Sequence, residues 1–104
     1  MLSRMATFDE LWADYSRERR PANLGARVNG VAIGELDAEI QDVAGSYAGL
    51  RGKLGAWRVA RLGLALAEVE RILPGLEPAE TRAYFERLAA LARAALADIA
   101  SQEA

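Results

Sequence analysis

Apolar residues recur at helical spacing along most of the chain, and this pattern predicts the fold class. Near the beginning they occupy one side of a run from Phe8 to Tyr15, at positions i, i+3, i+4 and i+7. Thr7 and Glu10, at the start of this run, match the capping-box pattern, which satisfies two backbone N–H groups of a first helical turn. Pro21 disfavours helical geometry in the residue before it. We therefore expect a first helix that begins near Thr7 and stops before Pro21.

Three further runs with the same periodicity predict three more helices. The expected limits are about Glu35 to Gly49 or Leu50, about Ala56 to Leu73, and Pro78 to about Ala100. The run after residue 55 is apolar around most of its circumference, which is typical of a central helix in a bundle. Four helices joined by short connections predict an all-α, up-down four-helix bundle that spans residues 1–104 as a single domain.

The segment 21–34 lacks helical periodicity. It contains the pair Asn29-Gly30, the strongest short signal for a tight turn between two strands. Residues 26–28 and 31–33 would then pair as a minimal β-hairpin. A two-stranded ribbon is marginal unless it packs against other elements. We therefore favour a plain, irregular loop that leads into the second helix, with the short hairpin as the alternative.

Composition narrows the chemistry that the chain can perform. It has no Cys and no His, which excludes disulfides, thiolate nucleophiles, Ser-His-Asp triads and the commonest transition-metal ligands. Tyr15, Tyr47, Glu39 and Asp42 are candidates for acid–base work, but their spacing does not favour them over any other set of such side chains. We expect a protein that is not an enzyme and that has no cofactor and no metal site.

Two features bear on where the protein acts. The longest apolar run, residues 62–67, is far shorter than the roughly 20 residues that span a bilayer. The first residues lack the apolar stretch of a secretory signal. We expect a cytoplasmic protein that does not contact a membrane. Its net charge of −2 argues mildly against a dedicated nucleic-acid binder.

Acidic residues gather at the start of the second predicted helix. Glu35, Glu39 and Asp42 follow at i, i+4 and i+7 and so share a face, with Asp37 close by. The simplest interpretation is a solvated face whose charge suits the helix dipole. The alternative is a docking surface for a basic protein partner. The spacing matches no EF-hand loop.

A basic, glycine-rich segment covers residues 49–61. Its candidate contact residues are Arg51, Lys53, Trp57, Arg58 and Arg61. Two Gly-x-x-Gly patterns in it match the type of loop that clamps a nucleic-acid backbone in KH domains. However, no strand pattern follows residue 55, as a KH domain requires. The segment is either an ordinary turn between helices or a contact site for phosphate or nucleic acid.

Two other surfaces are candidates for contacts. A second basic group flanks Pro21 and consists of Arg17, Arg19, Arg20 and Arg27; whether it meets residues 51–61 is open. Ala90, Ala94 and Ala97 form a small-residue face of the fourth helix. Helix propensity alone explains this alanine content, and a homodimer or partner contact is the alternative.

These features predict a non-catalytic helical module for protein–protein interaction, such as a regulator, an adaptor or an immunity-like inhibitor. The prediction rests on the missing His and Cys, the small size, and the separation of acidic from basic blocks, which favours specific docking. The alternative is a nucleic-acid-contacting accessory subunit that uses residues 49–61.

Overall fold

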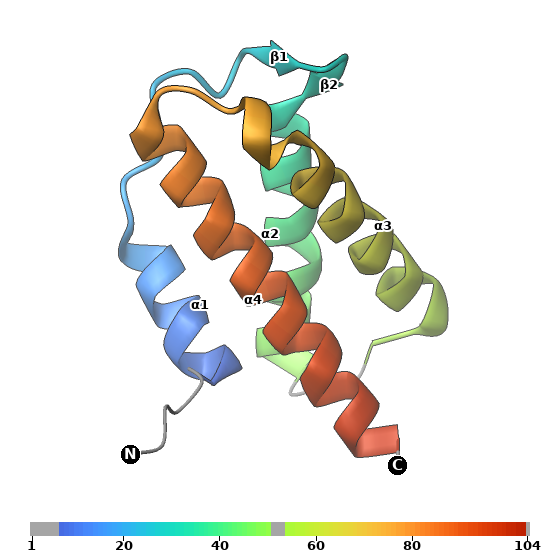
Figure 1. The fold of residues 1–104 in the computed structure, drawn as a ribbon. Coiled ribbons are helices and arrows are strands. Elements are labelled where there is room, and N and C mark those ends of the chain that lie inside the picture. The colour runs from blue at the N-terminus through green and yellow to red at the C-terminus, as the bar shows by residue number, and fades with distance from the viewer. Residues whose placement is uncertain (1–6, 51–53, 104) are drawn as a thin grey trace, which may run out of the picture.

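A computed structural model describes residues 7–50 and 54–103. In these residues it has four α-helices and one two-stranded antiparallel hairpin (Figure 1). The elements are α1 (Phe8–Arg17), β1 (Arg27–Val28), β2 (Val31–Ala32), α2 (Ile33–Leu50), α3 (Ala56–Ile72), the 3-10 turn η1 (Leu73–Gly75) and α4 (Ala79–Glu103). The predicted all-α four-helix bundle is confirmed.

The helices α2 and α4 form the middle of the bundle. Each packs against the other and against both α1 and α3, which lie on opposite sides of this pair (Figure 1). The expectation that the mostly apolar α3 lies in the centre is wrong. It buries Leu62, Val69 and Ile72 against α2 and α4 and leaves its outer side uncovered by any other described helix.

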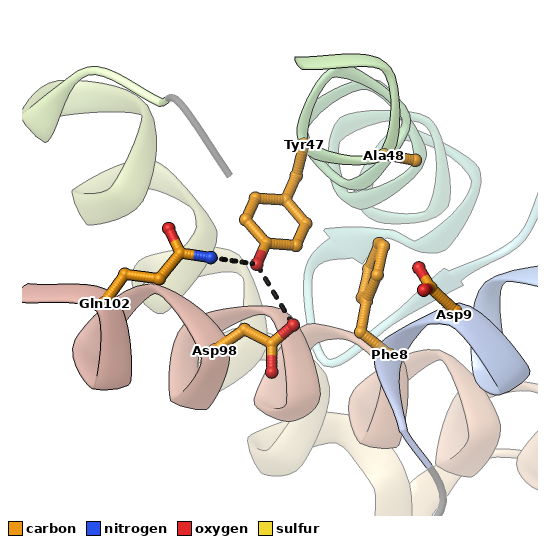
Figure 2. A pocket seen from close by; sticks show the side chains of 6 residues that line it. All are labelled: Phe8, Asp9, Tyr47, Ala48, Asp98 and Gln102. Atoms are coloured by element: carbon orange, nitrogen blue, oxygen red, sulfur yellow. Dashed lines mark hydrogen bonds between the residues drawn. The ribbon is translucent and has the colours of Figure 1, made fainter. Parts of the chain in front are cut away.

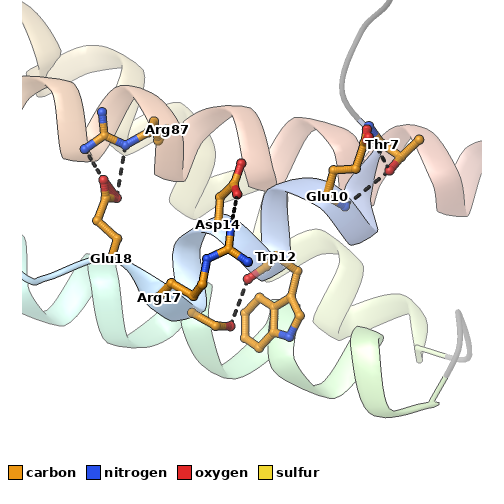
Figure 3. A network of polar contacts seen from close by, with 8 residues as sticks. Thr7, Glu10, Trp12, Asp14, Arg17, Glu18 and Arg87 are labelled. Carbon is orange, nitrogen blue, oxygen red and sulfur yellow. Dashed lines mark hydrogen bonds and ion pairs between the residues drawn. The ribbon is translucent and has the colours of Figure 1, made fainter.

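The capping box predicted at the start of α1 is confirmed. The Thr7 backbone N–H donates to Glu10 Oε1 at 2.8 Å, and the Glu10 N–H donates to Thr7 Oγ1 at 3.2 Å (Figure 3). The helix ends at Arg17, because Glu18 already has extended backbone angles (φ −77°, ψ 141°). The end of α1 is therefore set before Pro21 is reached.

Residues 27–32 form the hairpin, so the favoured plain loop is wrong. Val28 pairs with Val31, and both turn residues have positive φ, 51° at Asn29 and 80° at Gly30. Positive φ at both positions is the geometry that an Asn-Gly pair favours. The ribbon packs on η1, where a Cβ added to Gly75 would lie 3.6 Å from the Val28 side chain. This tertiary support offsets the marginal stability of two strands alone.

The chain passes from β2 directly into α2, two residues earlier than predicted, with Ile33 fully buried. One constraint acts at this junction. A Cβ added to Gly34 would lie 2.5 Å from the Leu24 carbonyl oxygen, closer than real side chains come to backbone. Gly63 in α3 differs, because an added Cβ there would meet nothing within 4 Å.

These two glycines give a matched pair of stability predictions. We expect Gly34→Ala to lower the free energy of unfolding by about 1–3 kcal/mol, because the Leu24 backbone must shift. We expect Gly63→Ala to raise it by about 0.5–1 kcal/mol, because alanine favours a helix where there is room for it. Urea unfolding at low protein concentration measures both, and an equally stable Gly34→Ala variant would contradict the close packing.

Candidate functional site

The outer side of α3 is the most unusual surface of the molecule. Trp57 is 63% exposed and Leu64 is 70% exposed, and these are the two large apolar side chains left exposed among the described residues. They are seven residues apart and therefore lie on one side of the helix. Ala60 lies three residues after Trp57, Ala67 lies three residues after Leu64, and both alanines are also exposed. We call Trp57, Ala60, Leu64 and Ala67 the α3 stripe.

Charged side chains border this stripe. Arg61 donates from Nε and Nη2 to Glu39 Oε1, at 2.9 and 2.7 Å, and its guanidinium carbon lies 4.9 Å from the centre of the Trp57 ring. Further along α3, Arg71 Nη2 is 2.7 Å from Glu68 Oε2. The Glu39 pair therefore fixes Arg61, and Arg61 in turn supports one face of the exposed indole.

Parts of the predicted acidic face and of the predicted basic segment, which the sequence analysis treated as separate surfaces, contact each other in the structure. Glu39 from the predicted acidic face pairs with Arg61 from the predicted basic segment, and Arg58 donates to Ser46 Oγ on α2 at 2.7 Å. Glu35 and Asp42 remain exposed. Of the remaining candidate contacts, Arg51 and Lys53 lie outside the described residues.

The prediction that the acidic residues of α2 form a solvated face is wrong for Asp37. Its side chain is buried, with 1% of the residue exposed, and Oδ1 accepts hydrogen bonds from the hydroxyls of Tyr15 at 2.9 Å and Tyr84 at 2.8 Å. Arg20 Nη1 lies 3.8 Å from Oδ2. A buried carboxylate is costly unless such donors satisfy it. The group therefore links α1, α2 and α4.

A signal for this burial is present in the sequence. Asp37 falls four residues after Ile33 and three before Ile40, so it occupies a position on the buried stripe of α2. A carboxylate at a core position requires donors from other helices. Their identity depends on the tertiary fold, so Tyr15 and Tyr84 are not predictable from the spacing.

The group of arginines around Pro21 lies on a different side of α2 from Arg58 and Arg61. Arg20 contacts Asp37 and Gln41, whereas Arg58 and Arg61 contact Ser46 and Glu39. At about 100° per residue these two sets of partners lie on nearly opposite faces of α2. Among the described residues, Arg20 therefore does not form one basic patch with Arg58 and Arg61. Near Pro21, Arg17 pairs with Asp14, and Glu18 pairs with Arg87 of α4 (Figure 3).

A small cavity of about 110 Å³ lies where α1, α2 and α4 meet, lined by Phe8, Asp9, Tyr47, Ala48, Asp98 and Gln102 (Figure 2). The Tyr47 hydroxyl donates to Asp98 Oδ2 at 3.0 Å and accepts from Gln102 Nε2 at 3.3 Å. Its volume is below the roughly 300 Å³ of ordinary ligand pockets. Tyr15, Tyr47 and Glu39 each bond a different partner, so they do not converge on one reacting centre.

The alanine face of α4 borders a shallow groove beside α1. Ala90, Ala94 and Ala97 line it together with Thr7 and Leu11. Ala97 is exposed, while Ala90 and Ala94 are half-buried. The face is therefore partly covered within the chain, and no large exposed apolar side chain is among the described residues that line the groove.

In residues 7–50 and 54–103, no three acidic side chains gather closely enough to hold a metal ion. No helix in the same residues is both long and apolar enough to cross a membrane.

The fold and its surfaces thus define a small, mostly helical bundle with a hairpin at one end and one apolar helix face left open. Comparison of the chain with protein-family models, with curated proteins and with solved structures finds no match.

The Asp37 group generates a stability prediction. We expect Asp37→Ala to lower the free energy of unfolding by about 2–4 kcal/mol, because it leaves two buried tyrosine hydroxyls without their acceptor. Asp42→Ala, at an exposed position of the same helix, is the control and should change it by less than about 0.5 kcal/mol. Denaturant unfolding compares them, and similar effects of the two variants would rule out a structural role for Asp37.

We expect a loss of stability at high pH, because the pKa values of Tyr15, Tyr47 and Tyr84 are raised in the folded chain. Burial is the main cause that raises the pKa of all three, from the ordinary value of 10.0 to about 12 for Tyr15. The unfolded chain then loses these protons first, so stability is full below pH 10 and falls above it. Tyr15 and Tyr84 should each contribute a slope of up to about 1.4 kcal/mol per pH unit. Absorbance of tyrosinate should rise together with the loss of helical circular dichroism; ionisation at pH 10 in a still-folded chain would contradict this.

Proposed function

We propose that this protein is a non-catalytic helical interaction module, of the regulator, adaptor or inhibitor type, that binds protein through the α3 stripe. The observation that carries the proposal is the exposure of Trp57 and Leu64 on one side of a helix. Single exposed apolar residues are common, but a contiguous apolar surface indicates a contact site. Tryptophan is also among the residues that contribute most to binding energy at interfaces.

The surroundings of the stripe support this function. The stripe lies on a regular helix, so its backbone loses little freedom on binding. The Arg61 guanidinium, bonded to Glu39, covers one face of the indole and restricts its motion. Each tryptophan or leucine side chain that becomes fully buried contributes about 1.5–3 kcal/mol. The two together contribute about 3–6 kcal/mol, so neighbouring contacts must add to them before the cost of association is offset.

The acidic face adds a polar border to this surface. Glu35 and Asp42 are exposed on α2, next along the helix to Glu39, which bonds Arg61 beside Trp57. Charge at a rim contributes to the rate and specificity of association more than to affinity. Nucleic-acid contact has less support, because Arg58 and Arg61 are already bonded to Ser46 and Glu39.

The test is a pull-down with tagged full-length chain from native-host lysate, with and without nuclease. We expect one or two stoichiometric, nuclease-resistant protein partners, and untagged copies of the chain count as such a partner. Trp57→Gln and Leu64→Gln should abolish or strongly reduce capture, because they remove the apolar anchors while keeping residues compatible with a helix.

Glu80→Gln, at an exposed position of α4 beside Arg19 and Arg87, is the control and should retain the partner. Retention by the α3 variants together with loss on reversing Glu35, Glu39 and Asp42 would move the interface to the acidic face. Recovery of nucleic acid, with affinity that falls steeply with salt, would support the accessory-subunit alternative instead. No capture under mild conditions would contradict an interaction module.

A further inference from the structure

We infer that the α3 stripe pairs with the same stripe of a second copy of this chain, as two antiparallel helices related by a two-fold axis beside Leu64. The inference rests on the proposed function, because it names the partner of that surface. Figure 1 shows α3 along one side of the bundle, with no other described helix on its outer side.

The spacing along the stripe is symmetric about Leu64. Trp57 lies seven residues before it, and the exposed Arg71 lies seven residues after it. An antiparallel two-fold arrangement places Trp57 of each copy beside the partner's Arg71, where indole and guanidinium attract each other. Ala60 and Ala67 face each other across the same axis, and their small side chains allow close approach of the helices.

The charges on the edge of the stripe are complementary under the same symmetry. Arg61 and Glu68 are seven residues apart and lie on one edge of the stripe, on either side of Leu64. A two-fold axis reverses the helix direction but keeps that edge, so each Arg61 meets the partner's Glu68. A parallel two-fold arrangement would instead place the Arg61 edge against the partner's Ala60 and Ala67 edge, without an opposite charge facing it.

These contacts extend ion pairs that already exist in one chain. Arg61 bonds Glu39, and Glu68 bonds Arg71. In the dimer these ion pairs join into two rows of alternating charge. Each row begins with Glu39 and Arg61 of one copy and continues with the partner's Glu68 and the partner's Arg71. A two-fold contact of this kind is self-complementary and closes, so it stops at a dimer.

The interface comprises one helix face from each copy. Such a contact is at the small end of specific interfaces and is expected to be weak and reversible. The groove at Ala90 and Ala94 is a poorer candidate for self-association, because these residues are half-buried and no large exposed apolar side chain lines the groove with them.

Sedimentation of the full chain over a range of concentrations tests the pairing. We expect a monomer–dimer equilibrium in the micromolar range that Leu64→Gln and Trp57→Gln each weaken by about tenfold or more, a loss that corresponds to one buried anchor. Ala94→Gln in the α4 groove is the matched control and should leave the equilibrium unchanged. Circular dichroism establishes that each variant is folded.

A charge-swap mixture tests the register. Arg61→Glu places two Glu–Glu contacts in its own dimer, and Glu68→Arg places two Arg–Arg contacts in its own dimer. Each variant alone should therefore dimerise several-fold more weakly than the original chain. An equimolar mixture should recover dimer, because both cross-pairs are then Glu–Arg. Recovery supports the antiparallel register, and a mixture as monomeric as its two components overturns it.

Other outcomes separate this inference from the proposed function. A chain that stays monomeric at several hundred micromolar, or a dimer lost in Ala94→Gln but kept in Leu64→Gln, overturns the α3 pairing. If Trp57 and Leu64 are still needed to capture a different protein, the proposed function stands without it. If no protein is captured and no dimer forms, the α3 pairing and the proposed function are both contradicted.

Discussion

The buried carboxylate of Asp37 is the interaction on which the arrangement of the helices depends. It is the one charged side chain that is buried among the described residues, and it accepts hydrogen bonds from Tyr15 of α1 and Tyr84 of α4. Both donors are needed, since a buried charge without partners destabilises a fold by several kcal/mol. Any packing that moved α1 or α4 away from this face of α2 would leave the carboxylate unsatisfied. The short α1 is thus held on one side of the central pair.

The position of α3 follows from this arrangement. With α1 beside Asp37, α3 takes the other side of α2 and α4, where it buries Leu62, Val69 and Ile72. No other described helix covers its outer side, so the apolar residues there remain at the surface. The exposed stripe is therefore the side of a helix that the bundle leaves uncovered, and a partner molecule can supply the missing cover.

Local signals predicted the helices well because their causes are local. The capping box at Thr7 and the apolar periodicity of the four runs act within a few residues, and the structure has these elements within a few residues of the expected limits. The hairpin was underestimated for the opposite reason. Asn29-Gly30 indicated its turn, but its stability comes from packing on η1, more than 40 residues further along the chain.

The candidate site was only partly predictable. The sequence brought Trp57, Arg58 and Arg61 into one segment, but it could not show that Arg61 turns to Glu39 and that the indole is exposed. Apolar residues around most of α3 indicated a central helix. This prediction was wrong, because the periodicity shows how much of a helix surface is apolar but not how many helices pack against it. Only the tertiary arrangement distinguishes a buried face from an interface.

Folding and the proposed binding therefore depend on different residues in this chain. Asp37, Tyr15 and Tyr84 hold helices together, whereas Trp57 and Leu64 make little contact that the core requires. Surface ion pairs such as Arg61–Glu39 contribute at most about 1 kcal/mol to stability. The more important effect of the Arg61–Glu39 pair is to orient Trp57, a side chain that the fold itself does not need. Because the core does not depend on Trp57 and Leu64, the stripe can be changed without loss of the bundle.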